Sequence, residues 1–421
     1  MSNQHFDVSG KGFKHLTPTR QALEVITSRI RHSVEIEDIP LSSALHRVLG
    51  EDLLSPIDLP AFDRAAMDGY AVRADDTYSA STSSPITLKP VKETIGVKKG
   101  EASLVVTGGR MPEGADAVVM VEYTRESSDG MVEVATEVHP WENVSRIGED
   151  LRKGALVLRA GQRLLPQDLG MLVCLGMQHV KVKRKLRIAV LSTGNEIRDA
   201  ASADSGKVPD VNRPILLNAI RELDCEPIDV GIAVDELDAI RGKLRQAMAE
   251  ADLVLITAGT SVGPRDFVPQ VINQLGKPGL LIHGVAMRPS MPTGLGIVDG
   301  KPIISLPGYP VSAYLAFLEF VPPLVDHLLG TEPLQARVIK VKLARRVAGV
   351  LGSRTYIRVR VFEEEGGTRA DPVSVSGAGI LSSLVRSNGF IIVPENVEGY
   401  EEGETVEAEL FRPVERNNAT N

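Results

Sequence analysis

The chain has 421 residues, 43% of them hydrophobic and 24% charged, and its formal net charge at pH 7 is −8. This composition is typical of a globular protein with about three domains, and it excludes a largely disordered chain. The acidic balance disfavours non-specific binding to nucleic acid. No apolar stretch approaches the roughly 18 residues of a membrane span, and the N-terminal residues have no apolar core. We therefore expect a cytoplasmic protein that binds neither nucleic acid nor membranes.

Two cysteines and one basic run have structural interpretations. Cys174 and Cys225 both lie in apolar patterns. We expect both to be buried, without a disulfide or zinc site, because they form no Cys-x-x-Cys and no Cys/His cluster. The run from Lys181 to Arg187 is either an anion-binding patch or, as is more common for a charge run, a solvated strand edge or interdomain turn.

The predicted elements of the first half of the chain are short. A helix is expected over 17–30, and a strand, a short helix and a strand over 34–55, a segment too short to be a domain alone. Residues 62–145 contain β-branched runs separated by Gly, Pro, Asp and Ser, which predict a mostly-β domain. A strand, a helix opened after Pro166 and another strand follow, up to about residue 184.

From about residue 186, strands and helices alternate. Strands are expected over 186–192, 226–234, 252–257, 280–287 and 301–306, and helices over 213–223, 235–251, 266–275 and 310–329. Uninterrupted apolar strands in βα units predict an α/β domain over 185–331, whose central sheet is doubly wound and mostly parallel. Further strands past Thr331 predict a C-terminal β domain over 332–413.

Ligands of such open sheets bind outside the carboxyl ends of the strands. Four predicted strands end in small or polar residues: Thr193, Gly194 and Glu196 after the first; Asp235 after the second; Gly259, Thr260, Ser261, Gly263 and Asp266 after the third; and Pro307, Gly308 and Pro310 after the last. Backbone N–H groups in such loops suit a phosphate. One carboxylate in each of the first three loops suits Mg²⁺, which is held by one or two protein oxygens.

The acids also have structural interpretations. Asp235 and Asp266 each precede a predicted helix and could serve as its N-cap. Glu196 is harder to explain in this way, since it follows a small-residue turn at a strand end. No Walker A, H-E-x-x-H or G-x-S-x-G motif competes with this interpretation.

Five motifs occur in an order that resembles a known family. They are PAFDRAAMDGYAV from Pro60, RIGEDLRKG from Arg146, LSTGNEI from Leu191, TAGTSVGPRDF from Thr257 and LPGYPVSAYLAF from Leu306. Over nearly its whole length the chain is similar to the MoeA family, the molybdopterin molybdenumtransferases, which includes the gephyrin E domain. The resemblance implies that 14–61 and 146–184 form one discontinuous, elongated linker or dimerisation domain, and that 62–145 is a mostly-β insertion.

The resemblance also implies an activity. Family members insert molybdate into adenylylated molybdopterin with Mg²⁺-dependent release of AMP, forming molybdenum cofactor. They act as homodimers, and the molybdopterin adenylyltransferase is a candidate partner. The implied catalytic residues are Asp63, Glu196, Asp235 and Asp266, of which the last three would bind Mg²⁺. The implied substrate-binding residues are Asp68, Thr107, Asp150, Thr193, Gly194, Gly259, Thr260, Ser261, Gly263, Arg288, Pro307, Gly308 and Pro310.

The chain departs from the family pattern at three places. Arg64 and Ala65 replace an Asn-Ser pair, Met291 replaces the second lysine of a Lys-Pro-Gly-Lys-Pro run that keeps one cation as Arg288, and Tyr309 replaces an asparagine. Lysine and arginine at different positions are not interchangeable in a site that binds anions. Two alternatives to an active enzyme therefore stay open: a non-catalytic pterin- or oxyanion-binding paralogue, and a scaffold protein.

Overall fold

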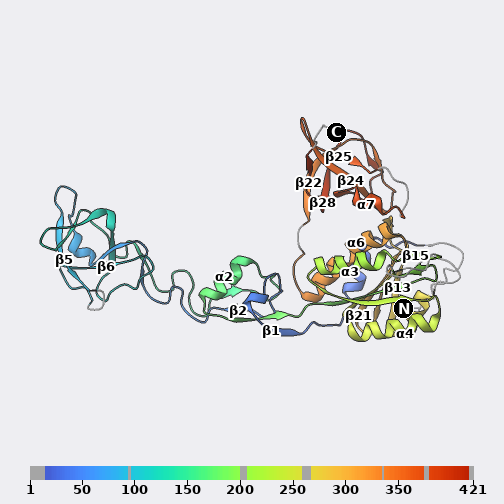
Figure 1. The fold of residues 1–421 in the computed structure, drawn as a ribbon, viewed down its shortest axis with the longest axis horizontal. Helices are drawn as coiled ribbons and strands as arrows, with labels where there is room; N and C mark the ends of the chain where they lie inside the picture. Colours follow the sequence, from blue (N-terminus) through green and yellow to red (C-terminus); the bar gives the residue numbers. More distant parts are fainter. Residues whose placement is uncertain are drawn as a thin grey trace. The chain divides into compact units, whose positions relative to one another are not determined.

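The structure is a computed structural model, which describes residues 15–92, 96–199, 206–257, 267–333, 336–373 and 379–416. The chain forms two compact units (Figure 1): unit 1 contains Met1–Glu37 and Lys183–Asn421, and unit 2 contains Asp38–Val182. The paired strands β1 (Ile36–Pro40) and β12 (His179–Lys183) carry the chain from one unit to the other.

Unit 1 contains a six-stranded mixed sheet. Its order is β16 (Glu226–Ala233), β13 (Arg187–Thr193), β17 (Leu253–Thr257), β21 (Lys301–Leu306), β20 (Gly294–Val298) and β18 (Pro278–His283). The first four strands are parallel, but β20 pairs antiparallel with β21, and β18 with β20. Because β18 is antiparallel to β20, it runs in the direction of the first four strands, and β20 alone runs against the others in this sheet; the two antiparallel pairings make the sheet mixed. The unpredicted strand, β20, enters a hairpin through Asp299-Gly300, a dipeptide that favours tight two-residue turns.

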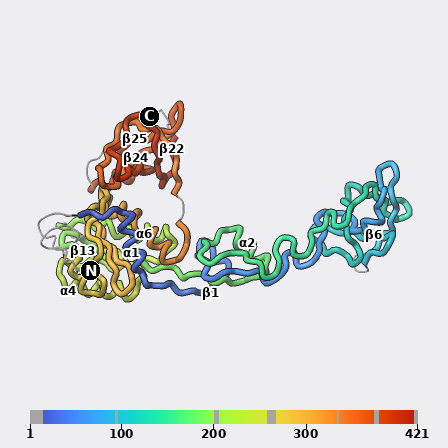
Figure 2. Tube along the Cα trace, turned by 180° about the vertical axis from the view of Figure 1, so that it is seen from behind, coloured from blue at the N-terminus to red at the C-terminus, as the bar shows by residue number. Residues whose placement is uncertain are grey.

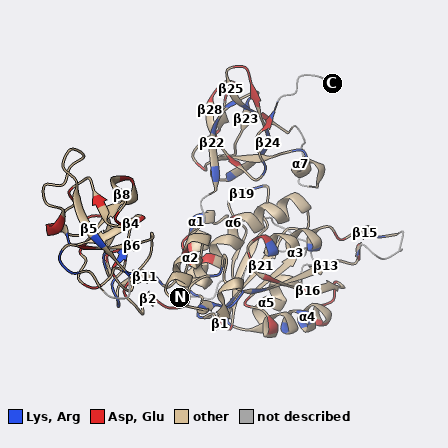
Figure 3. Cartoon of the chain, turned by 60° about the vertical axis from the view of Figure 1, so that its left-hand side comes forward, with Lys and Arg blue, Asp and Glu red and all other residues tan. Residues whose placement is uncertain are grey.

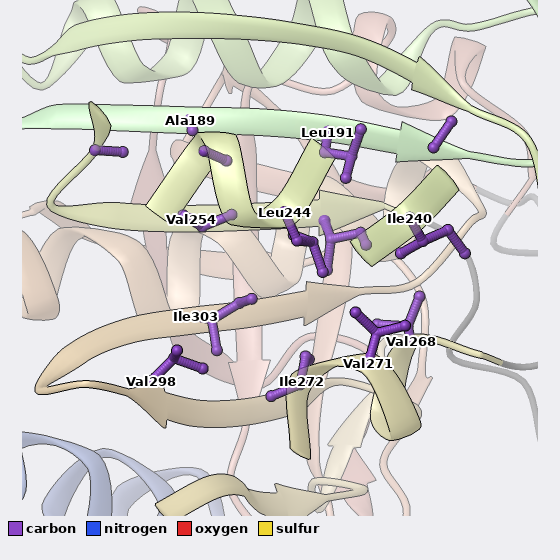
Figure 4. Packing of buried hydrophobic residues seen from close by; sticks show 14 of the residues in the cluster. Ala189, Leu191, Ile240, Leu244, Val254, Val268, Val271, Ile272, Val298 and Ile303 are labelled. Carbon is purple, nitrogen blue, oxygen red and sulfur yellow. The ribbon is translucent and has the colours of Figure 1, made fainter. Parts of the chain in front are cut away.

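Helices pack on both faces of this sheet (Figure 1). They are α1 (Thr19–Thr27), α3 (Asn212–Glu222), α4 (Leu237–Glu250), α5 (Val268–Leu275) and α6 (Pro310–Leu329). Ala189 and Leu191 of β13 point toward α4 and α5 and pack with Ile240 and Leu244 of α4 (Figure 4). The neighbouring Val190 is also fully buried, so β13 has no solvent-facing side along its centre. This double burial explains why the strand sequence is apolar without alternation.

The first helix belongs to this unit although it is distant in sequence. In Figure 2 the blue helix α1 lies beside the α/β part of the chain, and it packs against α6 and β20. Thr17, just before the helix, donates its N–H to the Gly284 carbonyl at 3.1 Å and accepts the Ala286 N–H at 2.8 Å. The N-terminal segment is therefore anchored to the sheet that carries the predicted site.

A second sheet of unit 1 holds the C-terminal strands. Its order is β19 (Met287–Arg288), β24 (Arg354–Glu364), β25 (Gly367–Pro372), β22 (Arg337–Leu343), β28 (Thr405–Leu410) and β26 (Gly389–Val393), with β29 (Glu415–Arg416) paired to β24. Beside it lie the pair β23 (Val347–Ala348) and β27 (Gly399–Tyr400), and helix α7 (Ser382–Val385). The Tyr356 hydroxyl donates to Glu319 of α6, and Arg354 lies 3.4 Å from the same carboxylate. These polar contacts join the second sheet to α6.

Unit 2 contains its own six-stranded sheet. Its order is β7 (Ala117–Met120), β4 (Gly69–Val72), β6 (Glu101–Val105), β5 (Ile86–Val91), β9 (Val132–Val134) and β8 (Thr124–Glu126). Among its described residues, unit 2 also has helix α2 (Pro166–Cys174), the pairs β3 (Arg64–Ala65) with β10 (Val144–Ser145) and β2 (Leu53–Leu54) with β11 (Leu156–Leu158), and 3₁₀ turns at Leu41–Ser43, Ala74–Thr77 and Val121–Tyr123. A further short pair, β14 (Ile197–Arg198) with β15 (Val208–Pro209), belongs to unit 1.

Two expectations about single residues are resolved by the fold. Cys225 is buried, but Cys174 is exposed, because it ends α2 on the side away from the core residue Leu172. In the basic run, Arg184 bonds Asp252 through both terminal nitrogens, at 2.7 and 2.8 Å, and Lys181 lies 3.0 Å from Glu51. These ion pairs favour the connector interpretation of the run over an anion-binding patch.

Candidate functional site

The loop after β13 presents Glu196. Glu196 is exposed, whereas Thr193 before it is fully buried and its hydroxyl lies 3.4 Å from the Thr257 carbonyl. Gly194 has φ +148°, and a Cβ built on it would lie 2.8 and 2.9 Å from the two carboxylate oxygens of Glu196. The Glu196 carboxylate therefore folds back over Gly194, and a side chain at 194 would require the carboxylate to shift.

Reciprocal hydrogen bonds join this loop to the loop after β16. The Asn195 N–H donates to Asp235 Oδ2 at 3.3 Å, and the Asp235 N–H donates to Asn195 Oδ1 at 3.2 Å. The Gly194 N–H also donates to the Ala233 carbonyl at 3.2 Å. The loops that carry Glu196 and Asp235, after the parallel strands β13 and β16, are therefore joined at the carboxyl edge of the sheet.

Asp235 does not cap α4. The N-cap position belongs to Glu236, and no side chain bonds the first turn there. The structural interpretation of Asp235 as an N-cap is therefore wrong. For the third acid no such test exists: Gly259, Thr260, Ser261, Gly263 and Asp266 lie outside the residues that the structure describes. Within the described residues, no group of three or more His, Cys, Asp or Glu side chains could hold a metal ion.

The loop after β21 opens α6. Pro307 is buried, Gly308 is exposed and Pro310 is the first residue of the helix. Proline is favoured at that position because its missing N–H would have no partner within the helix. Asn212, the first residue of α3, donates its side-chain N–H to the Gly308 carbonyl at 2.7 Å. The starts of α3 and α6 are thus tied together at the same edge of the sheet as Glu196.

Arg288 belongs to a different element. It is exposed at the end of β19 and pairs with Thr355 of β24, so its backbone is part of the C-terminal sheet. The turn that follows it is fixed from α6, because the Ser290 hydroxyl donates to the Ser312 carbonyl at 2.7 Å. The structure therefore connects Arg288 to the start of α6 through this turn.

Two of the predicted residues of unit 2, Asp68 and Thr107, bond each other. Asp68 Oδ1 accepts the Thr107 N–H at 2.6 Å and the Thr107 hydroxyl at 2.8 Å, and these bonds hold the pKa of Asp68 below its usual range. Asp63 Oδ1 accepts the Ile147 N–H at 2.7 Å, which fixes the segment that carries the exposed Asp150. The hydrogen bonds thus join Asp68 to Thr107, whereas Asp63 bonds Ile147, and the roles of these residues in a site stay predictions.

Charges of both signs are interspersed on both units (Figure 3). No helix among the described residues has the length and apolarity needed to cross a membrane. Sequence reasoning missed Asn195 and Asn212, whose amides join loops that are distant in sequence. Their only local signal was an asparagine beside a predicted strand end or helix start.

Three family models match successive parts of the chain. They are the MoeA N-terminal region (domain I and II) over residues 17–176, a family described as a probable molybdopterin binding domain over 189–327, and the MoeA C-terminal region (domain IV) over 340–411. The molybdopterin molybdenumtransferase of Haemophilus influenzae is 33% identical, covering 93% of this chain and 98% of that protein. The Bacillus subtilis protein of the same name is 32% identical, covering 90% of each.

A solved structure is similar over the same extent. The crystal structure of the molybdopterin biosynthesis moeA protein from Pyrococcus horikoshii OT3 aligns with a TM-score of 0.80 and 34% sequence identity. The alignment covers 94% of this chain and all of that one. The similarity therefore includes the α/β part, the C-terminal sheet and unit 2, and is not confined to one widespread domain.

Proposed function

Because this chain belongs to the MoeA family, we propose that it is a molybdopterin molybdenumtransferase, a transferase that inserts molybdenum during cofactor biosynthesis. The finer part of the proposal is that adenylylated molybdopterin and molybdate are its substrates and that AMP is released in the presence of Mg²⁺. The observation that carries the proposal is the side-by-side placement of the Glu196 and Asp235 loops.

The described donors fit Mg²⁺. This ion takes oxygen ligands and is commonly held by one or two carboxylates, while water and phosphate complete its shell. Glu196 and Asp235 supply two such carboxylates at the open edge of the sheet, and we propose Asp266 as the third acid. When bound, Mg²⁺ neutralises charge on the phosphoryl oxygens of the substrate.

The chain's own residues would bind and orient the substrate. The N–H groups at the start of α6 and in the Pro307–Pro310 turn suit a phosphate of the pterin, since the N-terminus of a helix attracts anions. Arg288 supplies an exposed cation for the same anionic groups. We propose that Glu196 orients the water that cleaves the phosphoanhydride bond, because its exposed carboxylate lies close over Gly194 at the carboxyl edge of the sheet.

In unit 2, we propose that Asp63, Asp68, Thr107 and Asp150 also take part in binding or catalysis. The two Thr107 hydrogen bonds lower the pKa of Asp68, and its carboxylate is ionised at neutral pH as any ordinary aspartate is. An ionised carboxylate can accept hydrogen bonds from the amino and ring N–H groups of a pterin.

The experiment that tests this function measures AMP release from adenylylated molybdopterin with molybdate and Mg²⁺. Glu196→Gln keeps the size of the side chain but removes its charge, so we expect turnover to be lost while the fold remains. Glu236→Gln is the matched control, since Glu236 is exposed, directly follows Asp235 and makes no side-chain cap bond to α4. A fully active Glu196→Gln enzyme would refute the role of this residue, and a wild-type protein without AMP release would refute the activity.

A second candidate function is binding of the pterin or of an oxyanion without turnover. It is favoured by Tyr309, which is 66% exposed at the N-cap of α6 where the family pattern has an asparagine. A phenol ring beside the turn could bind a ligand without replacing the lost amide. The same assay decides between the two, because tight binding of molybdopterin without AMP release supports only the second.

We further propose a cytoplasmic homodimer, with the adenylyltransferase as a candidate partner. Support for self-association comes from unit 2, where Leu54 and Leu156 lie directly opposite each other and are 54% and 39% exposed. Exposed apolar pairs of this kind are typical of interaction surfaces. Leu54→Glu should therefore yield a monomer in analytical ultracentrifugation, and a dimer that persists would contradict this interface.

The domain boundaries also remain a proposal: 14–61 with 146–184, 62–145, 185–331 and 332–413. Separate buried clusters support them, since the cluster around Leu88 draws only on residues of 62–145 and the cluster around Leu164 only on the two linker segments. A fragment of residues 62–145 should fold alone, as judged by its NMR amide dispersion.

A further inference from the structure

The side chain of Asn212 has one hydrogen-bonded end and one without a partner. Asn212 is 8% exposed, and its Nδ2 donates to the Gly308 carbonyl at 2.7 Å. Its Oδ1 is buried and has no hydrogen-bond partner within the described residues. Buried polar atoms are nearly always satisfied, so an unsatisfied amide oxygen calls for an explanation.

Helix capping does not explain this residue. The first turn of α3 is already served by Asp210, whose carboxylate accepts the Arg213 N–H at 3.2 Å. Arg213 in turn lies 3.3 Å from Asp210 and 2.9 Å from Asp229 of β16, which fixes the start of α3 against the sheet. The local structure around Asn212 is thus held by neighbouring residues, and its only described side-chain bond leads to the turn before α6.

Stability does not explain it either. An amide that is buried with one end unpaired is destabilising relative to an apolar side chain of the same shape. A residue kept only for packing would therefore be expected to be leucine, as at the nearby buried Leu216. Residues that cost stability and persist are found mainly at functional sites.

From this geometry we infer that Asn212 is a positioning residue for the substrate, acting through the Gly308 carbonyl. By holding that carbonyl back toward α3, Nδ2 sets the orientation of the Gly308–Tyr309 peptide and of the turn that opens α6. The turn and the first N–H groups of α6 are thereby aimed outward, toward the anionic part of a pterin phosphate. This inference rests on the proposed function and adds to it the residue that fixes the anion-binding turn.

The test compares Asn212→Leu with Asn218→Leu. Asn218 lies on the same helix and is exposed; its Nδ2 donates to the Pro214 carbonyl and its Oδ1 accepts from Arg221 of the same helix, so it controls for an added leucine on α3. For Asn212→Leu we expect a melting temperature equal to or above that of the wild type. We also expect faster amide hydrogen exchange over 308–313 and a KM for adenylylated molybdopterin raised on the order of 10- to 100-fold, the usual effect of a misplaced binding group.

A merely structural role predicts a different pattern, in which the melting temperature falls and the KM does not change; this result would overturn the inference. If Asn212→Leu fails to fold, Asn212→Asp decides, because it keeps the volume but cannot donate from a carboxylate to Gly308. Wild-type affinity in Asn212→Asp would also overturn the inference. If the wild type shows no turnover, the proposed function fails by itself. The inference is then tested by calorimetric binding of molybdopterin, which Asn212→Leu should weaken by the same factor.

Discussion

Gly194→Ala should lower the kcat of the enzyme without removing any charged group. The added Cβ would lie 2.8 and 2.9 Å from the carboxylate oxygens of Glu196 and 3.0 Å from its Cδ. Ordinary contacts to carbon begin near 3.5 Å, so the carboxylate would have to retreat by roughly 0.6 Å. Displacements of about 1 Å in a reacting group reduce rates on the order of 100-fold. We therefore expect a fall in kcat of tenfold to a hundredfold.

The same substitution has a backbone cost. Gly194 has φ +148°, a region that L-residues rarely occupy, and such a conformation costs about 1–3 kcal/mol. Gly330→Ala separates this cost from the displacement of Glu196. Gly330 ends α6 at φ +65°, and a Cβ there meets nothing within 4 Å. Both variants should lose stability, but only Gly194→Ala should lose activity.

The assay is AMP release at saturating substrate, together with chemical denaturation of each variant. If the position of the Glu196 carboxylate matters for turnover, Gly194→Ala should have a lower kcat than Gly330→Ala at a similar loss of stability. Equal activity in Gly194→Ala and the wild type would show that the position of Glu196 over Gly194 is irrelevant to turnover. Equal loss of activity in both variants would show that instability, and not the carboxylate, is the cause.

Three further predictions concern stability. Gly242→Ala should stabilise the protein by about 0.5–1 kcal/mol in urea denaturation, because Gly242 lies inside α4 and a Cβ there meets nothing within 4 Å; a loss of stability would contradict this. Tyr356→Phe should cost about 1–3 kcal/mol, since it leaves the Glu319 carboxylate without its hydroxyl donor, and a neutral effect would show that Arg354 suffices. Burial lowers the pKa of His283, so below its unfolded value of about 6.5 the unfolded chain binds a proton that the folded chain does not. The free energy of unfolding should therefore fall as the pH drops below about 6.5, by up to about 1.4 kcal/mol per pH unit, until the pH lies below the folded pKa of His283. His283→Gln should remove this slope in denaturation measured between pH 5 and 8.

Much of the α/β part could be predicted from the sequence because its signals are local. The uninterrupted apolar run of β13 and the proline that opens α6 each specify an element by themselves, and α6 spans the predicted residues 310–329. Strand β20 was missed because its glycines suggested a loop. The residues that indicate the hairpin are Asp299-Gly300, which directly follow β20 and connect it to its partner β21.

The site was only partly predictable, for a physical reason. That Glu196 and Asp235 follow neighbouring strands could be inferred from the βα pattern, but the reciprocal bonds through Asn195 depend on the register of β13 against β16. No local pattern specifies that register. The same holds for Asn212, whose partner Gly308 is 96 residues away in sequence. The loop with Asp266 lies outside the described residues, so its part in the site stays a prediction.

The departure at Met291 changes charge more than shape. The Met291 carbonyl accepts the Val285 N–H at 2.8 Å, and the Thr293 hydroxyl bonds the Ser290 carbonyl at 2.7 Å, so backbone contacts fix the turn whatever side chain stands at 291. Met291 is only half-buried, which leaves room for a lysine to extend toward solvent. Met291→Lys should therefore keep the fold and restore the family's second cation.

One charge-assisted hydrogen bond to an anion contributes about 1.5–3 kcal/mol, so the Met291→Lys enzyme should bind molybdate at least tenfold more tightly. Isothermal titration with molybdate, in the presence of molybdopterin, measures this directly. Met248→Lys, on α4, is the control for an added positive charge elsewhere in unit 1. If both variants bind molybdate like the wild type, position 291 does not face the oxyanion, and Arg288 alone supplies the cation that this chain uses.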